Sequence, residues 1–269
     1  MAIVKGIMQI YGSVGGFTFY TRKGSKNTIM RAKGGPTKKQ MENSPKFEKL
    51  RKNQTEFGGC SRFGSKSRKA FGELLKSADY PLHSTLTSIG KILMKMDTTH
   101  EPGTRNLNLS LHKEVLDDFN FNKKYRFSNV FYVTPTCEIN RENLQATVNI
   151  PDVYTSSDLK SKYKLPFFRL IVVLGTVSDL AYDPVKKKYE PMVMELHGTS
   201  ITVTGEWYST HTILPKSSMT VQMHDSQKAF LTENVTIVIS MGIEFGDTGF
   251  DKQPVAKLFS GCGKVIAVG

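Results

Sequence analysis

A strict alternation of apolar residues near the C-terminus constrains the fold more than any other feature of the sequence. Six apolar residues occupy every second position from 235 to 245: Val235, Ile237, Ile239, Met241, Ile243 and Phe245. Successive side chains of a β-strand point to opposite faces of a sheet, so this period of two predicts one long strand with an apolar face.

Other segments of the C-terminal half also have the character of strands: 130–134, 144–150, 189–197, 201–207, 219–223 and 264–268. Residues 167–177 are almost entirely apolar, which is typical of a strand that is covered on both faces. The total of about eight strands is usual for antiparallel sandwiches. We therefore predict an antiparallel β-sandwich over residues 129–269 that folds on its own.

Residues 37–97 have the pattern of helices. Ser44-Pro45 predicts a helix start, because serine caps the first turn and proline fits its first position. Gly58-Gly59 predicts the end of this helix, and a second helix is expected over residues 61–76. A third helix carries an apolar seam that needs a partner helix or sheet face: Leu82, Leu86, Ile89, Leu93 and Met96.

The first 35 residues are rich in glycine and β-like. Residues 17–22 and 27–32 predict two strands, joined by a turn in which Gly24 supplies the positive φ that such turns need. The predicted fold class is therefore α+β. We expect three parts: a basic hairpin and helical module over residues 1–97, a connector over 98–128 and the antiparallel β-sandwich domain over 129–269.

The positive charge of the chain is confined to one end. The formal net charge is +13. Residues 1–76 contain 17 Lys or Arg and four Asp or Glu, whereas residues 77–269 contain 20 of each kind. An excess confined to one segment forms a patch, and the field of such a patch attracts polyanions.

Cations of this basic segment are the candidate nucleic-acid-binding residues: Arg22, Lys23, Lys26, Arg31, Lys38, Lys39, Arg51, Lys52, Arg62, Lys66, Arg68 and Lys69. Lys and Arg neutralise phosphates and release counterions, and interleaved aromatic residues such as Tyr20 can stack on bases. Two other interpretations stay open: the same face docks an acidic protein neighbour, or it serves only solubility. The two basic helices around Gly58-Gly59 also resemble a helix-turn-helix, although the apolar pattern of its turn is missing.

No catalytic motif occurs in the sequence, which lacks the signatures of serine hydrolases, zinc proteases, phosphate loops and dinucleotide-binding folds. His197, His211 and His224 would hold a metal only if the fold brought them together. Trp207 would serve a sugar site only if its ring were exposed. We predict no catalytic residue, no metal and no cofactor. A carbohydrate-binding protein or hydrolase built on the sandwich is the weakest alternative.

The three cysteines are odd in number and form no CxxC pair, which argues against a disulfide framework and favours a reducing compartment. The sequence has no run of 18 apolar residues and no secretory signal. We therefore expect a cytoplasmic or virion-associated protein with no membrane partner. A homo-oligomer stays open.

Several short motifs mark the opening of the chain: Gly12-Ser13-Val14-Gly15-Gly16, Arg22-Lys23-Gly24, Ile29-Met30-Arg31, and a polar helix from Gln40 through Asn43-Ser44 to Arg51. In these motifs the chain resembles a broad set of uncharacterised proteins from gut bacteria and from phages or mobile elements. The resemblance covers about the first 75 residues. It implies a non-enzymatic role associated with a virion or a mobile element. We expect sequence-independent binding of nucleic acid first, and a phage structural subunit that docks an acidic neighbour second.

Overall fold

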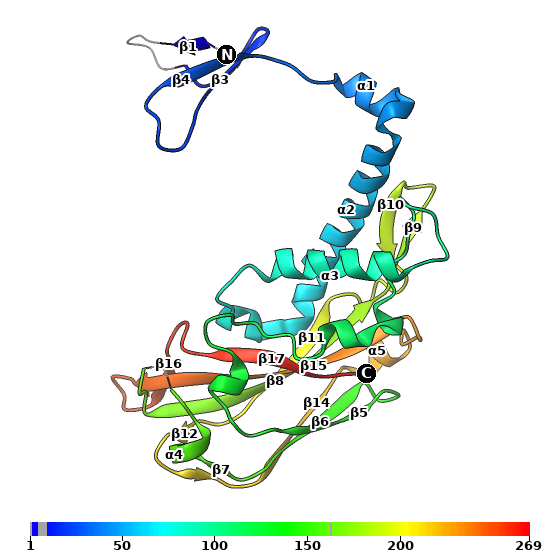
Figure 1. Cartoon of the computed structure of the whole chain (residues 1–269). Coiled ribbons are helices and arrows are strands. Elements are labelled where there is room, and N and C mark those ends of the chain that lie inside the picture. The colour runs from blue at the N-terminus through cyan, green and yellow to red at the C-terminus, as the bar shows by residue number, and fades with distance from the viewer. Residues whose placement is uncertain (1, 5–9, 162) are drawn as a thin grey trace. The chain divides into compact units, whose positions relative to one another are not determined.

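A computed structural model describes residues 2–4, 10–161 and 163–269 and has a mixed α+β fold, as the sequence predicts (Figure 1). The chain divides into two compact units. We call residues 1–51 the N-terminal unit and residues 52–269 the body. None of the described helices is long and apolar enough to cross a membrane.

The N-terminal unit contains a four-stranded antiparallel sheet in the order β1-β4-β3-β2. Its strands are β1 (Ala2–Val4), β2 (Gly12–Val14), β3 (Phe17–Thr21) and β4 (Thr28–Ala32). The predicted hairpin is confirmed, because β3 pairs with β4 from Phe17 opposite Ala32 to Thr21 opposite Thr28. The backbone amide of Ser25 donates to the carbonyl of Arg22 at 3.0 Å and closes the turn between them.

Helices follow this sheet. The first, α1 (Lys38–Asn43), begins at Thr37, whose side chain and that of Gln40 form a reciprocal capping box. A 3₁₀ turn, η1 (Pro45–Phe47), leads into α2 (Glu48–Ser67). The predicted helix end at Gly58-Gly59 is wrong, because α2 continues through both residues. Gly59 serves packing instead: a Cβ there would lie 2.6 Å from the ring of Tyr189.

A six-stranded antiparallel sheet forms the centre of the body. The two longest strands, β8 (Phe167–Ser178) and β15 (Val235–Thr248), pair along nearly their whole length. The other strands flank this pair: β11 (Thr199–Thr204) and β12 (Tyr208–Ser209) beside β8, and β16 (Pro254–Ala256) and β17 (Cys262–Val268) beside β15. The two strongest strand predictions are thereby confirmed.

A three-stranded sheet covers one face of this central sheet. Its order is β14-β6-β5, with β14 (Ser217–Gln222) and β5 (Thr136–Asn140) on either side of β6 (Gln145–Ile150). Val148 and Val221 share a buried core with Leu174 and Ile239 of the central sheet. The predicted packing of two antiparallel sheets is therefore present in the body.

Smaller elements connect these layers. They are η3 (Leu109–Leu111), η4 (Lys113–Leu116), η5 (Phe127–Asn129), β7 (Val153–Tyr154), α4 (Thr155–Asp158), the hairpin of β9 (Leu180–Asp183) and β10 (Lys188–Pro191), β13 (Ile213–Leu214) and α5 (Asp225–Lys228). The strand predicted over residues 130–134 is not formed, and the strand predicted over residues 189–197 is regular only up to Pro191, where β10 ends. Val130 and Phe131 reach the core from an irregular segment instead.

Helices cover the opposite face of the central sheet. The 3₁₀ helix η2 (Arg68–Ser77) and α3 (Leu82–Met96) share a second core with Val173 and Val238 of that sheet. The close approach of η2 requires a glycine in β8, since a Cβ at Gly175 would lie 2.0 Å from the carbonyl oxygen of Ala70. The predicted seam of α3 is buried at Leu86 and Leu93, as expected.

This second core explains why the chain divides after Arg51 and not after residue 97, where the sequence analysis placed the boundary. The helices of residues 52–97 bury a sheet face that would otherwise expose apolar side chains. The predicted connector, residues 98–128, contributes to the same core through Leu109 and Phe121. Residues 52–269 therefore form one body of three layers, in which helices, a large sheet and a small sheet are stacked.

Candidate nucleic-acid interface

The structure divides the twelve predicted cations between the two units. Seven lie in the N-terminal unit: Arg22, Lys23, Lys26, Arg31, Lys38, Lys39 and Arg51. Five lie in the body: Lys52, Arg62, Lys66, Arg68 and Lys69. Each set is therefore described within its own unit.

In the N-terminal unit, most predicted cations are exposed. Arg22, Lys23 and Lys26 all belong to the exposed turn between β3 and β4. Arg31 pairs with Thr18 across these strands and so lies on the sheet face that also carries Tyr20. The first 41 residues contain eight Lys or Arg and no Asp or Glu, so the field of these cations is not cancelled locally. The first acidic residue of the chain, Glu42, lies 3.8 Å from Lys38.

Arg51 has a structural role within this unit. Its Nη1 donates to the carbonyl oxygen of Met41 at 2.7 Å and to that of Ser44 at 2.9 Å. These carbonyls stand at the end of α1, where a helix leaves acceptors without intrahelical partners. The guanidinium thus joins the end of α1 to the start of α2, which gives Arg51 a structural role.

In the body, an acidic residue organises cations from two elements. The Glu190 carboxylate on β10 lies 2.6 Å from Nη2 of Arg62 on α2 and 3.0 Å from Nζ of Lys188. The hydrogen bond from Lys188 and the nearby Arg62 guanidinium lower the pKa of Glu190. This contact ties the hairpin β9–β10 to α2, and Figure 1 shows the two elements side by side.

The hairpin adds cations that the sequence analysis missed. Lys186, Lys187 and Lys188 are exposed at its tip, and the latter two line a concavity of about 230 Å³ together with α2. The run of three lysines was visible in the sequence, but it lies in the charge-balanced half of the chain. Nothing in the local pattern indicates that it meets α2, because the contact joins residues far apart in the sequence.

Lys66, Arg68 and Lys69 lie where α2 passes into η2, and Arg68 and Lys69 are exposed. His197 is buried close to them, with 7% of its surface exposed. Burial, followed by the charges of Lys66 and Arg62, lowers the pKa of His197 to about 4. Its Nδ1 accepts a hydrogen bond from the amide of Ser178 at 3.3 Å. The ring is therefore neutral at pH 7 with its proton on Nε2, and it adds no charge to this surface.

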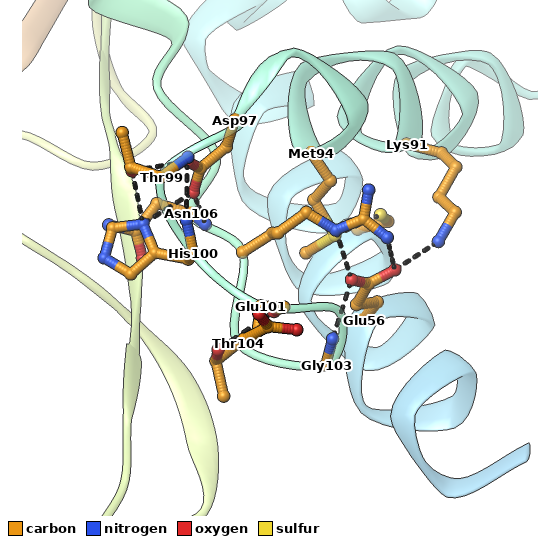
Figure 2. A network of polar contacts seen from close by, with 12 residues as sticks. Glu56, Lys91, Met94, Asp97, Thr99, His100, Glu101, Gly103, Thr104 and Asn106 are labelled. Atoms are coloured by element: carbon orange, nitrogen blue, oxygen red, sulfur yellow. Dashed lines mark hydrogen bonds and ion pairs between the residues drawn. The ribbon is translucent and has the colours of Figure 1, made fainter. Parts of the chain in front are cut away.

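Lys52 packs over the loop that follows α3, since a Cβ at Gly103 would lie 2.9 Å from its Cγ. Figure 2 shows the polar network that anchors this loop. The buried Glu56 accepts hydrogen bonds from Lys91, from the amide of Gly103 at 2.9 Å and from Nε of Arg105 at 2.8 Å. Burial alone would raise the pKa of Glu56, but these bonds lower it.

A second carboxylate, Asp97, completes the anchor. It accepts hydrogen bonds from the amide of Thr99 at 2.9 Å, the amide of Asn106 at 2.7 Å and Nδ1 of His100 at 2.8 Å (Figure 2). Burial would raise the pKa of Asp97, yet the bonds from Thr99 and Asn106 hold it well below its usual range. Glu56 and Asp97 thus fix residues 97–106 against α2 and α3, and we assign them a structural role.

The structure also describes the surroundings of the histidines, cysteines and tryptophan of the chain. Within the described ranges, no group of three or more His, Cys, Asp or Glu is placed to hold a metal. Burial raises the pKa of Cys137 to about 11 and that of Cys262 to about 12, so both stay protonated thiols at neutral pH. The Arg169 guanidinium covers the ring of Trp207, with Cζ 4.5 Å from the ring centroid, and pairs with Glu244 at 2.6 Å.

The helix-turn-helix interpretation is wrong, because α2 is uninterrupted through Gly58 and Gly59. Comparison of the chain with protein families, curated proteins and solved structures found no match. The cation geometry is therefore the main guide to function.

Proposed function

We propose that this chain is a non-enzymatic binding protein whose N-terminal unit binds the phosphate backbone of nucleic acid without sequence preference. The observation that carries the proposal is the charge of this unit: 11 Lys or Arg against two acidic residues within 51 positions. A segment of this size with a net excess of nine positive charges creates a field that attracts polyanions over several ångströms. The body contributes further cations along α2.

The proposed contacts are made by the exposed turn of Arg22, Lys23 and Lys26 and by Arg31 on the adjacent sheet face. Phosphate contacts of this kind position a nucleic acid but carry no sequence information, which accounts for the expected lack of preference. Each neutralised phosphate releases counterions, so affinity falls steeply with salt. Such a protein would work in the cytoplasm or in association with a virion.

A salt titration tests this function. The full chain is titrated with random duplex and single-stranded oligonucleotides from about 50 mM salt upwards, and the slope of log K against log salt is measured. If the turn makes three phosphate contacts, the triple variant Arg22→Gln, Lys23→Gln, Lys26→Gln loses about 2.7 units of slope on duplex DNA. The matched control replaces three exposed lysines of the body with glutamine: Lys160, Lys164 and Lys216. An absence of binding at the lowest salt, or equal slopes for the two triple variants, contradicts the proposal.

A second candidate function, assembly with other protein subunits, is favoured by the segment between β15 and β17, which includes β16. Four apolar side chains of this segment are exposed: Phe250, which is fully exposed, Val255 of β16 (54% exposed), Leu258 (80%) and Phe259 (75%). Several exposed apolar residues in one short segment are typical of an interaction site. Lys252 and Lys257 accompany them, which suits an acidic neighbour such as a subunit of a phage particle.

Sedimentation of the full chain over a range of concentrations tests this second function. We expect self-association or co-assembly that is lost when Phe250, Leu258 and Phe259 are replaced with serine. The same variant should retain the circular dichroism spectrum of the parent, because these side chains are exposed. A parent that stays monomeric alone and in the presence of acidic polypeptides contradicts the assembly function.

A further inference from the structure

One glycine of α2 has no explanation within the chain. Gly59 is required because a Cβ would lie 2.6 Å from the Tyr189 ring, and Gly64 because a Cβ would lie 2.7 Å from Oγ1 of Thr87. A Cβ at Gly58, by contrast, would meet no described atom within 4 Å. Glycine in a helix interior destabilises the helix relative to alanine. Internal packing therefore does not account for Gly58.

The surroundings of Gly58 point to an external molecule. Gly58 lines the concavity of about 230 Å³ that α2 and the hairpin β9–β10 form. Gln54 and Arg62 stand four residues before and after it, so they share its helix face and also line the concavity. Lys187 and Lys188 of the hairpin line it as well.

The concavity has an excess of positive charge. Glu190 is shared between Arg62 and Lys188, and Lys186 lies 3.8 Å from Asp183. Lys187 makes no ion pair with any residue that the structure describes, and it is exposed. An anion bound in the concavity could therefore pair with Lys187. Because Gly58 has no side chain, the anion could also approach the backbone of α2 closely.

We infer that this concavity, the Gly58 notch, holds one phosphate of a nucleic-acid backbone, with Lys187 as its main charge partner and Gln54 as a hydrogen-bond donor. The inference rests on the proposed function, to which it adds a second binding site in the body. We assign the anion as a backbone phosphodiester because the proposed function brings such groups to this protein, and the two unbridged oxygens of a phosphodiester share a negative charge that can face Lys187.

The decisive variants are Gly58→Gln, which fills the notch, and Lys187→Gln, which removes its charge. Each is expected to weaken binding of the full chain to random oligonucleotides by about eightfold at 0.1 M salt and to lower the salt slope by about 0.9. Gly58→Ala is expected to raise Tm by about 2–4 °C, because alanine favours the helix, while it weakens binding. Higher stability with lower affinity distinguishes a binding role from a structural one.

Two control variants match these changes at exposed positions of α3: Ser88→Gln for the added side chain and Lys95→Gln for the lost charge. Both should bind like the parent. If the notch variants bind oligonucleotides as tightly as the parent does, the notch is not a phosphate site, and the proposed function of the N-terminal unit stands. If the parent binds no oligonucleotide, both are refuted. A parent that binds polyglutamate at the notch more tightly than oligonucleotides refutes the phosphate assignment in favour of an acidic protein.

Discussion

Acid should destabilise this protein through His197. The ring is buried beside Lys66 and Arg62, and its pKa falls to about 4 from the ordinary value of 6.5. The folded state disfavours the charged ring. The neutral ring of His197 therefore makes its full contribution to the unfolding free energy above pH 6.5, and this contribution is lost as the pH falls toward 4. The lowered pKa of His197 corresponds to a contribution of about 3 kcal/mol in total.

The perturbation is His197→Asn, whose Oδ1 can accept the hydrogen bond that Ser178 donates to Nδ1. Urea unfolding is measured for the parent and the variant at pH 7.5 and pH 4.5. Over this interval, proton linkage predicts that the parent loses about 2–3 kcal/mol more unfolding free energy than the variant. Buried carboxylates, such as Asp179 with its raised pKa, titrate in both proteins and cancel in the difference.

The exposed His211 provides the control, since His211→Asn should follow the parent at both pH values. Replacing Lys66 with methionine should reduce the acid loss, because it removes one of the charges that lower the pKa of His197. Parallel losses in the parent and in His197→Asn would refute the reasoning and would mean that the ring gains a partner or water in the folded state.

Three further outcomes follow from the layered body. A fragment of residues 52–269 should fold on its own, as measured by circular dichroism. A fragment of residues 129–269 should not, because it lacks the helices that cover the second face of the central sheet. A folded fragment of residues 129–269 would contradict the three-layer body. Leu86→Asp should lower the unfolding free energy by about 4 kcal/mol in urea titration, since it places a charge in a fully buried position; a change within about 0.5 kcal/mol would show that the seam is solvent-accessible. Glu56→Ala should make the loop of residues 97–106 susceptible to limited proteolysis, because the loop loses its buried acceptor; cleavage equal to that of the parent contradicts the anchoring role.

Much of the sheet architecture was predictable, because alternation along β15 is a local signal. The residues between the apolar positions of β15 also indicate the surroundings of this strand. Thr236, Val238, Ser240 and Gly242 are small and uncharged, and they face the helical layer, not solvent. A solvated face would carry charged side chains, so small residues at these positions indicate a covered face.

Less of the candidate site was predictable, because its contacts join distant parts of the chain. The pair of Arg62 and Glu190 brings the lysines of the hairpin β9–β10 to α2, and no local pattern encodes that meeting. The wrong prediction of a helix end at Gly58-Gly59 has a related cause. Gly59 looks like a helix terminator, but its absent side chain makes room for Tyr189, which lies 130 positions later.

The paired strands β8 and β15 belong to two cores at once, since alternate side chains enter the helical layer and the small sheet. The two layers therefore cannot open independently, and the backbone amides of these strands should be the last to exchange with deuterated solvent. A ligand bound to α2 of the folded state would then slow exchange deep in β15, although it touches no residue there. At a concentration of 100 times Kd, the added protection is about 2.7 kcal/mol. Hydrogen exchange at the centre of the sheet can therefore be used to detect ligand binding on the surface of α2.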